Sequence, residues 1–362
     1  MPEKITKEKI LENLSEIKEP VIGKSLTDLN LIRNVSIKNG TVSLSFILIS
    51  PRYPHQENIE TEIREKLGAL DGVKGIKLNP LMEVPVDGQI KATGNSSIKT
   101  VIAVASGKGG VGKSTVSVNV AASLAKAGAE VGLLDADVYG PNIPMMMGVE
   151  KLPPQDTSTG KITPAEAYGL KLVSIGFMVE PGKPIIWRGP MLHGAIQQFI
   201  RDVDWGEIDY LVVDLPPGTG DAQLSLAQTI SITGGVIVTL PQQVSLEDAR
   251  RGLELFKQLD VPVLGVVENM SYLELPGGQK MDIFGSGGGE RLAKDANVEF
   301  LGAIPIDPSI REGGDVGKPI AVTVPDSPIA QALSSLAIEI ALRTSVIALR
   351  NQTQGVQINF IN

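Results

Sequence analysis

Cysteine is absent from this 362-residue sequence. The chain alone can therefore form no disulfide, carry no thiol nucleophile and build no thiolate metal site. Histidine is nearly as scarce, with His55 and His193 as the two examples. Neither has a second ligand at a spacing typical of a metal site, so we expect His55 to lie on a surface loop and His193 to be packed or to cap a helix.

Positive charge is also in deficit, with 33 Lys and Arg against 41 Asp and Glu and a net charge of -8. A nucleic-acid groove needs clustered basic side chains to neutralise phosphates, so nucleic acid is excluded as the main partner. No uninterrupted apolar run is long enough to span a bilayer, and the first residues, MPEKITKEKILENL, contain no apolar signal core. We expect a cytoplasmic protein with no membrane partner.

The chain is longer than one hydrophobic core usually serves, which favours two domains. Residues 1–86 have the pattern of a small α+β domain, and residues 87–99 are polar with Gly and Ser, as in a linker. Lys38-Asn39-Gly40 separates two apolar runs and predicts a hairpin. The expected elements are helices over 6–17 and 58–70 and strands over 32–37, 42–49 and 73–78.

Residues 100–350 differ in texture, because short Val, Ile and Leu runs recur with little polar alternation. Continuous apolar strands between helical stretches indicate an α/β fold, a mostly parallel sheet with helices on both faces. The last helix is apolar and weakly basic, so docking on the sheet is favoured over lying on a membrane surface. Residues 351–362 are expected to form a polar tail. The strands are expected over 101–105, 131–134, 170–175, 210–213, 236–240, 263–267 and 300–304, and the helices over 113–127, 192–202, 222–232, 246–259 and 329–349.

A glycine-rich loop, Gly107-Lys-Gly-Gly-Val-Gly-Lys-Ser-Thr115, joins a strand that ends at Ser106 to an apolar-periodic helix. This is the P-loop pattern in its strand–loop–helix context. The glycines let successive N–H groups converge on phosphate oxygens, and the helix N-terminus adds its dipole. Lys113 is expected to be catalytic by reaching the β- and γ-phosphates, and the Ser114 hydroxyl to bind Mg²⁺. We predict ATP with Mg²⁺ as the ligand, contacted by Gly107, Lys108, Gly109, Gly110, Val111, Gly112, Lys113, Ser114 and Thr115.

Aspartates follow two of the predicted strands at their carboxyl ends, where ligands bind in open α/β sheets. Asp135 and Asp137 close the strand over 131–134, and because the chain leaves the strand there, separate tasks are open to them. Asp214 follows four apolar residues in the Walker B arrangement, which places it to hold a magnesium-bound water. Gly218 and Gly220 give the next loop freedom to respond to the γ-phosphate.

Because Lys108 stands early in it, the loop resembles that of the deviant P-loop ATPases, the superfamily of MinD, ParA and the nitrogenase iron protein. The resemblance implies that Lys108 is catalytic across a dimer, on the partner's nucleotide, as an arginine finger is; a solvated loop lysine is the alternative. It also implies that a catalytic Asp137 positions the attacking water, that Asp135 lies near the magnesium shell and that Asn269 contacts the adenine edge. Asn269 is equally suited to a turn. The magnesium ligands expected on this basis, partly through water, are Ser114, Asp137 and Asp214.

Longer strings narrow the resemblance to the Mrp/ApbC family of iron–sulfur cluster carrier ATPases. The strings are DADVYGPNIP (135–144), WRGPM (187–191), WGEIDYLVVDLPPGTGDAQLSLAQ (205–228), PQQVSLEDARRG (241–252), VENMSY (267–272) and IFG (283–285). The likeness covers nearly all of residues 100–330, and the small domain is similar to the one that precedes many bacterial Mrp ATPases. It implies ATP hydrolysis by a homodimer and transfer of a labile 4Fe–4S cluster, with iron–sulfur scaffolds or apoprotein clients as partners.

The sequence departs from this family where the cluster ligands belong. The family's Cys-x-x-Cys pair aligns with Leu275 and Gly278, and the frequent cysteine of the small domain is replaced within Ser50–Pro54. Iron–sulfur clusters are held chiefly by thiolates, so a cluster held by this chain alone is not expected. We therefore expect an Mrp-type ATPase in iron–sulfur assembly, acting as a carrier or as an ATP-gated helper to cysteine-bearing partners, with the missing thiolates weakening the carrier form.

Two other functions use the same scaffold. A MinD/ParA-like nucleotide-switched protein that binds partners without a cluster would need a basic amphipathic C-terminal helix or a basic surface, which the composition does not favour. A small-molecule ligase or kinase would need a second substrate pocket, which the sequence does not disclose.

Overall fold

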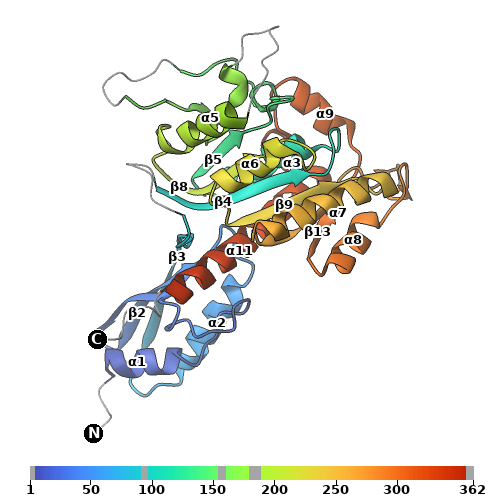
Figure 1. Ribbon diagram of the computed structural model, residues 1–362. Coiled ribbons are helices and arrows are strands. Elements are labelled where there is room, and N and C mark those ends of the chain that lie inside the picture. Colours follow the sequence, from blue (N-terminus) through green and yellow to red (C-terminus); the bar gives the residue numbers. More distant parts are fainter. Residues whose placement is uncertain (1–4, 91–96, 154–159, 179–188, 356–362) are drawn as a thin grey trace. The chain divides into compact units, whose positions relative to one another are not determined.

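The computed structural model describes residues 5–90, 97–153, 160–178 and 189–355 (Figure 1). The chain forms two compact units, Met1–Pro85 and Val86–Asn362. Parts of the predicted linker, of the WRGPM segment and of the predicted tail lie outside the described residues, namely 91–96, 187–188 and 356–362.

The small unit is a three-stranded sheet packed with two helices. Its elements are α1 (Lys7–Leu14), β1 (Ile32–Lys38), β2 (Thr41–Leu48), α2 (Gln56–Gly68) and β3 (Gly75–Met82). β2 pairs antiparallel with β1 and parallel with β3, and α2 makes the crossover between those two parallel strands. Asn39 and Gly40 form the two-residue turn between β1 and β2, with φ of 51° and 83°. Both values lie in the left-handed region that such turns require, so the predicted hairpin is confirmed.

Tyr53 lies buried in the small unit and donates a hydrogen bond to the carboxylate of Glu19. The same carboxylate accepts hydrogen bonds from the backbone N–H groups of Val21 (2.9 Å) and Ile22 (2.5 Å). Burial first, and then Glu19, raise the pKa of the Tyr53 phenol above its ordinary value, so the phenol stays protonated and able to donate. Within the segment Ser50–Pro54, Tyr53 therefore has a structural role as the hydrogen-bond partner of Glu19.

The larger unit is built on an eight-stranded sheet with the order β13-β10-β9-β4-β8-β5-β7-β6. Every neighbouring pair is parallel except β6–β7, so the predicted mostly parallel sheet is confirmed. β4 pairs with β8 on one side and β9 on the other, which places the glycine-rich loop that follows β4 near the middle of the sheet's carboxyl edge. The strands are β4 (Ser97–Ser106), β5 (Val131–Asp135), β6 (Ala165–Ala167), β7 (Leu170–Ser174), β8 (Glu207–Asp214), β9 (Gly234–Thr239), β10 (Val263–Glu268) and β13 (Phe300–Ala303).

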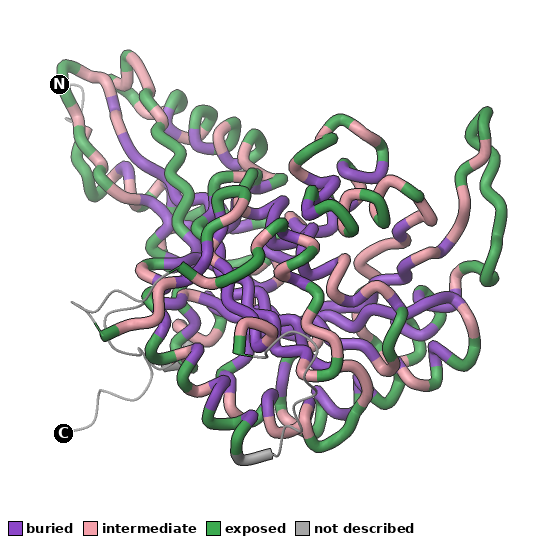
Figure 2. The backbone as a smooth tube through the Cα atoms, turned by 90° about the horizontal axis from the view of Figure 1, so that it is seen from above, coloured by how far each residue is buried: buried purple, intermediate pink, exposed green. Residues whose placement is uncertain are grey.

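Helices cover both faces of this sheet, as predicted. Val101, Ala103 and Ala105 of β4 share one hydrophobic core with α5, α6, α7 and α8. Ile102 and Val104 alternate with them, are fully buried, and face the opposite side, where α3 and α11 pack on β4. Figure 2 shows buried residues, in purple, concentrated in the interior of the tube, and exposed residues, in green, mostly on its outer loops and turns. The helices are α3 (Lys113–Lys126), α4 (Ile143–Met146), α5 (Gly189–Arg201), α6 (Asp221–Thr229), α7 (Gln243–Gln258), α8 (Gly288–Ala296), α9 (Pro308–Asp315), α10 (Ile320–Thr323) and α11 (Pro328–Gly355).

α11 is long and apolar enough to cross a membrane by length and composition, over Pro328–Gln352. It packs, however, on α3 and on strands of the large sheet, and 61% of its apolar window is buried. An apolar surface that already contacts protein is typical of a core helix. The predicted docking of this helix on the sheet is therefore confirmed.

Several elements begin or end a few residues from the sequence-based boundaries, and two of these differences fall in the predicted linker and tail. β4 begins at Ser97, inside the predicted linker over 87–99, because Ile98 pairs with Ile208 of β8 and Lys99 Nζ lies 2.7 Å from Asp209 Oδ1. α11 continues to Gly355, past the predicted start of the tail at residue 351. Its last turns are held by side chains, since Asn351 Nδ2 donates to Asp87 Oδ1 (3.0 Å) and Gln352 Nε2 to the Val86 carbonyl (2.6 Å).

Candidate nucleotide-binding site

The glycine-rich loop runs from the end of β4 at Ser106 to the start of α3 at Lys113. Gly112 has φ of 83°, and a Cβ atom there would lie 2.1 Å from Asn269 Nδ2. Gly107 has a different constraint, because a Cβ atom would lie 2.0 Å from the backbone carbonyl carbon of Asp248 in α7. Both positions therefore require glycine, one for its conformation and contact and the other for close packing.

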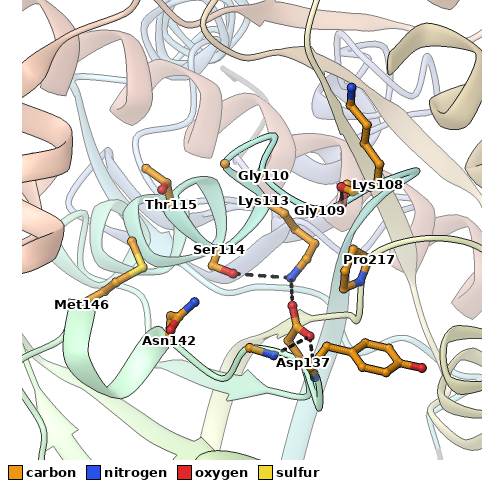
Figure 3. A pocket seen from close by; sticks show the side chains of 14 residues that line it. Lys108, Gly109, Gly110, Lys113, Ser114, Thr115, Asp137, Asn142, Met146 and Pro217 are labelled. Atoms are coloured by element: carbon orange, nitrogen blue, oxygen red, sulfur yellow. Dashed lines mark hydrogen bonds and ion pairs between the residues drawn. The ribbon is translucent and has the colours of Figure 1, made fainter. Parts of the chain in front are cut away.

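A cavity of about 360 Å³ opens over this loop (Figure 3). It lies at the carboxyl edge of the sheet, where the loops after β4, β5 and β8 meet, as ligand sites do in open α/β folds. Of the residues that the sequence marked for ATP and Mg²⁺, Asp137 and most of the loop line it, whereas Gly107, Val111, Asp214 and Asn269 do not. The lining consists of Ser106, Lys108, Gly109, Gly110, Gly112, Lys113, Ser114, Thr115, Asp137, Tyr139, Gly140, Asn142, Met146 and Pro217.

Lys113 is buried at the floor of the cavity between two carboxylates. Its Nζ lies 2.7 Å from Asp214 Oδ2 and 3.3 Å from Asp137 Oδ2. Burial alone lowers the pKa of Lys113, but the charges of Asp214 and Asp137 outweigh burial and raise it above its ordinary value. The lysine therefore stays protonated, which gives the cavity a fixed positive charge suited to phosphate oxygens.

Asp214 is fully buried at the end of β8 and accepts hydrogen bonds from both ends of the first turn of α3. Its Oδ2 lies 2.6 Å from Ser114 Oγ, and its Oδ1 lies 2.6 Å from Ser117 Oγ. Carboxylate and hydroxyl oxygens beside a phosphate cavity are the donors that Mg²⁺ prefers. The sequence analysis did not predict Ser117 as a site residue, although its position three residues after Ser114 puts both hydroxyls on one face of a helix.

Asp135 and Asp137 have different surroundings, although two positions separate them. Asp137 faces Lys113, and its Oδ1 accepts from the backbone N–H groups of Tyr139 (3.1 Å) and Gly140 (3.3 Å). Asp135 is fully buried and accepts from the Asp137 backbone N–H (3.2 Å), from Ile143 N (3.3 Å) and from Ser174 Oγ (2.8 Å). Asp137 therefore lines the cavity, whereas Asp135 holds the segment after β5 in place.

The pKa of Asp135 is raised to about 7, by burial first and by the charge of Asp214 second. The unfolded chain releases this proton near pH 4, so between about pH 4 and 7 the folded state binds more protons. The stabilising contribution of this group is full below pH 4 and is lost as the pH rises through 7.

We accordingly predict that Asp135→Asn makes the free energy of unfolding of the nucleotide-free protein less dependent on pH. Asparagine has no proton to lose, while Asp137, whose pKa burial also raises, keeps part of the slope. Urea titrations at pH 5 and pH 8 measure the difference. Asp202→Asn, an exposed change on the last turn of the α5 region, is the control and should follow the parent chain. Equal slopes in Asp135→Asn and the parent would contradict this assignment.

Asn269 joins the phosphate loop to a second cavity of about 550 Å³. The side chain is buried, and its Nδ2 donates to the Val111 carbonyl at 2.8 Å. The second cavity shares Thr115, Asn142 and Met146 with the first, so the two are adjacent. The sequence analysis missed most of its lining, which is Thr115, Asn142, Met145, Met146, Asn269, Met270, Pro305, Ile306, Asp307, Pro308, Ile310, Arg311, Gly314 and Asp315.

Lys108 is half-buried at the rim of the first cavity. Figure 3 shows its side chain directed away from Lys113 and Asp137. Within the described parts of the chain it forms no ion pair, in contrast to Lys113. Its backbone carbonyl accepts a hydrogen bond from Ser106 Oγ (2.9 Å), which fixes the loop while the side chain extends outward.

The positions aligned with the family's cysteine pair lie in a short hairpin. β11 (Leu273–Glu274) and β12 (Lys280–Met281) pair antiparallel, and the turn is closed by bonds from Leu275 N to the Gln279 carbonyl (2.8 Å) and from Gly278 N to the Leu275 carbonyl (3.0 Å). Neither Leu275 nor Gly278 has a side chain that can ligate iron, and the whole sequence has no cysteine. The residues present therefore do not fit an iron–sulfur cluster.

The histidines take structural contacts. The His55 ring packs edge-on against Tyr53, with centroids 5.6 Å apart, and His193 Nδ1 lies 2.6 Å from Thr229 Oγ1 between α5 and α6. Among the residues that the structure describes, no group of three or more His, Cys, Asp or Glu could hold a metal ion.

Comparison with known families matches both parts of the chain. Residues 97–341 match the family described as the NUBPL iron-transfer P-loop NTPase, and residues 7–78 match the iron–sulfur cluster assembly protein family. The iron–sulfur cluster carrier protein of Synechocystis sp. is 48% identical over 95% of this chain and 99% of its own length. That of Escherichia coli is 38% identical over 91% and 89%. The iron–sulfur cluster transfer protein NUBPL of Dictyostelium discoideum is 47% identical over 72% and 81%.

Solved structures with the same fold are also known. A nucleotide-binding protein from Archaeoglobus fulgidus, solved in complex with ADP, is 40% identical and covers 61% of this chain and 88% of its own, with a TM-score of 0.54. The cell division ATPase MinD of Pyrococcus furiosus is 24% identical and covers 67% and 98%, with a TM-score of 0.50. At that identity the second likeness shows the fold alone.

Proposed function

Because the chain belongs to the family of iron-transfer P-loop NTPases, we propose that it binds ATP with Mg²⁺ and hydrolyses it as a homodimer. Its role is in iron–sulfur cluster assembly or transfer to apoproteins, the role that its relatives' names give them and that its Mrp/ApbC resemblance predicted. The single observation that carries the proposed reaction is the buried group of Lys113, Asp214, Asp137 and Ser114 beneath the glycine-rich loop.

Each member of this group has a proposed task. Lys113 contacts the β- and γ-phosphates of the nucleotide. The Ser114 hydroxyl binds Mg²⁺ directly, and Asp214 and Asp137 hold it partly through water, where the ion would screen phosphate charge. Asp137 also orients the attacking water, because its carboxylate lies in the cavity beside Lys113. The backbone N–H groups from Gly107 to Thr115 cradle the phosphates.

The second cavity is the proposed site of the nucleoside. It adjoins the phosphate cavity, and its walls combine Met145 and Met146 with the loop Pro305–Pro308, the apolar surfaces against which a purine packs. Asn269 stands at the junction, and its amide is the proposed contact for the adenine edge. In support, the A. fulgidus relative was solved in complex with ADP.

Homodimerisation is proposed because Lys108 has no task within its own chain. Its side chain extends from the rim of the cavity and forms no ion pair within the described residues, so a second copy facing this rim would place Lys108 near the partner's phosphates. A cation supplied in trans stabilises transition-state charge as an arginine finger does.

The cluster itself is cargo whose ligands must come from another protein. The chain offers no thiolate, so we propose that it acts as an ATP-gated helper to cysteine-bearing scaffolds and apoprotein clients. The MinD/ParA-like alternative, with membrane or nucleic acid as partner, has no specific observation in its favour, since α11 is mostly buried and the net charge is -8.

A cluster-transfer assay tests this function. A thiolate-ligated 4Fe–4S donor protein and an apo-ferredoxin acceptor are mixed anaerobically with the full chain, and acceptor loading is followed by its visible circular dichroism. We expect Mg-ATP to accelerate loading in the presence of the chain, with phosphate released. Loading that is equally fast without the chain, or with the chain and no nucleotide, would refute the helper role.

A further inference from the structure

Glu268 is a buried carboxylate at the end of β10, immediately before Asn269. It accepts hydrogen bonds from Ser271 Oγ (2.5 Å), from Gly287 N (3.2 Å) and from Gly289 N (2.5 Å). Within the described residues it has no ion pair, so its charge is balanced by neutral donors and by the N-terminus of α8. A buried carboxylate with this many donors and no cation is costly to move, because each donor would lose its partner.

These donors lie on both sides of one segment. Ser271 precedes the hairpin of β11 and β12, and Gly287 and Gly289 follow it, so Glu268 closes the segment at its base. The backbone adds a second tie, since Ile304 N donates to the Glu268 carbonyl at 2.8 Å and Ser271 N donates to the Ile304 carbonyl at 2.9 Å. Glu268 and its immediate neighbours therefore hold the base of the hairpin, and Leu273 also pairs with Ile306.

The same stretch holds the phosphate loop. Asn269 Nδ2 donates to the Val111 carbonyl at 2.8 Å, and its close approach to Gly112 leaves no room for a Cβ atom. The Asn269 backbone N–H donates to the Thr239 carbonyl at 2.8 Å. A shift of Val111 and Gly112 when phosphate binds would therefore displace Asn269 first and Glu268 next.

The hairpin and the residues that follow it directly have an exposed, partly apolar surface. Met281 and Ile283 are each 46% exposed and Phe284 is 38% exposed, while Lys280 Nζ lies 4.0 Å from the ring centroid of Tyr272. The hairpin itself touches no nucleotide cavity, since its residues line neither. Within the described residues the hairpin has two connections to the cavities, the pairing of Leu273 with Ile306 of the second cavity and the base at Glu268, and the base connects to the phosphate loop through Asn269.

We propose that Glu268 is a positioning residue that transmits the nucleotide state of the phosphate loop to the hairpin Leu273–Met281. This inference rests on the proposed function, because it requires that the loop bind ATP. It adds an output to that function, an element whose position depends on nucleotide and whose exposed surface lies outside the nucleotide site.

The absence of cysteine makes the test direct, because one introduced cysteine is the only thiol of the full chain. Gln279→Cys places it on the exposed turn of the hairpin. Its rate of reaction with an aromatic disulfide reagent is measured with and without Mg-ATP, while a fluorescent ATP analogue reports binding separately. We expect Mg-ATP to change the rate by roughly fivefold or more, the lower end of ordinary coupling between sites. With Glu268→Gln added, the rate should no longer depend on Mg-ATP, although the analogue still binds.

Two controls and one replacement variant distinguish a positioning role of Glu268 from a general structural role. Lys126→Cys, at the exposed end of α3, should react at a rate independent of nucleotide. Glu290→Gln removes an exposed carboxylate from the first turn of α8 and should leave the Gln279→Cys response intact. Should Glu268→Gln not fold, Ser271→Ala removes a single donor of the network and is expected to reduce the response partly.

The outcomes are distinguishable. If the analogue does not bind the parent chain, the proposed function fails and the inference with it. If it binds but Mg-ATP leaves the Gln279→Cys rate unchanged, the inference alone fails. A full response that persists in Glu268→Gln, or in Ser271→Ala when the former does not fold, also overturns it.

Discussion

Lys113→Ala is expected to abolish ATP binding and turnover. The substitution removes the one cation that lies between Asp137 and Asp214, at 3.3 and 2.7 Å, and leaves two carboxylates facing the phosphate cavity. A triphosphate would then meet net negative charge where it now meets a protonated amine. Equilibrium binding of a fluorescent ATP analogue and phosphate release with Mg-ATP are the measurements.

The same substitution should destabilise the nucleotide-free protein, because removing one partner of a buried ion pair typically costs about 3–5 kcal/mol. Binding is therefore compared at a temperature at which circular dichroism shows the variant folded. Lys113→Met, which keeps the length of the stem, is the second variant and should also fail to bind. Lys126→Ala, an exposed change on the same helix, is the matched control and should behave as the parent. ATP turnover by Lys113→Ala within a few-fold of the parent would contradict the proposed role of Lys113 in binding phosphate.

Lys108→Ala is expected to spare ATP binding and to reduce turnover by roughly two to three orders of magnitude, at or below the lower end of the effect of an arginine finger. Binding should survive because Lys108 points away from Lys113 and Asp137 and belongs to no ion pair in the described structure. A loop lysine that is merely solvated would change turnover little, so a near-parental rate would contradict the proposed role.

Mixing variants tests the dimer itself. In a heterodimer of Lys108→Ala and Asp137→Ala, one site combines an intact Asp137 with the intact Lys108 of the other chain. Random pairing in a two-fold dimer should then restore about a quarter of the parental rate. A mixture of Lys113→Ala and Asp137→Ala, both expected to act within their own chain, should restore nothing. Failure of the first mixture to recover activity would count against Lys108 acting in trans.

Much of the scaffold follows from local sequence. Strands such as Val131–Asp135 are buried on both faces and so are continuously apolar, a pattern that few other elements share. The Asn39-Gly40 turn and the loop after Ser106 are equally predictable from the sequence, because their backbone conformations require particular residues. The positions of Lys113, Asp137 and Asp214 followed from their places after strands, since parallel strands end at one edge.

The walls of the second cavity were less predictable, for physical reasons. α4 has four residues, and α9 contains the polar run Arg311-Glu-Gly-Gly, so neither shows a helical apolar period. The two helices pack on each other, and just after α9 the Tyr168 hydroxyl donates to the Gly317 carbonyl at 2.6 Å. The role of Glu268 was equally hard to predict from the sequence, because its hydrogen-bond donors lie 3 to 21 positions away in the chain.

We propose that this chain hydrolyses ATP as a homodimer and that the ligands of the cluster belong to other proteins. Anaerobic reconstitution of the full chain with ferrous iron, sulfide and Mg-ATP tests it most directly, with visible absorbance, bound iron and released phosphate measured on one sample. The account predicts Mg-dependent phosphate release with no cluster absorbance and no protein-bound iron after desalting. A cluster bound in stoichiometric amount by the chain alone, or the absence of phosphate release, would contradict it.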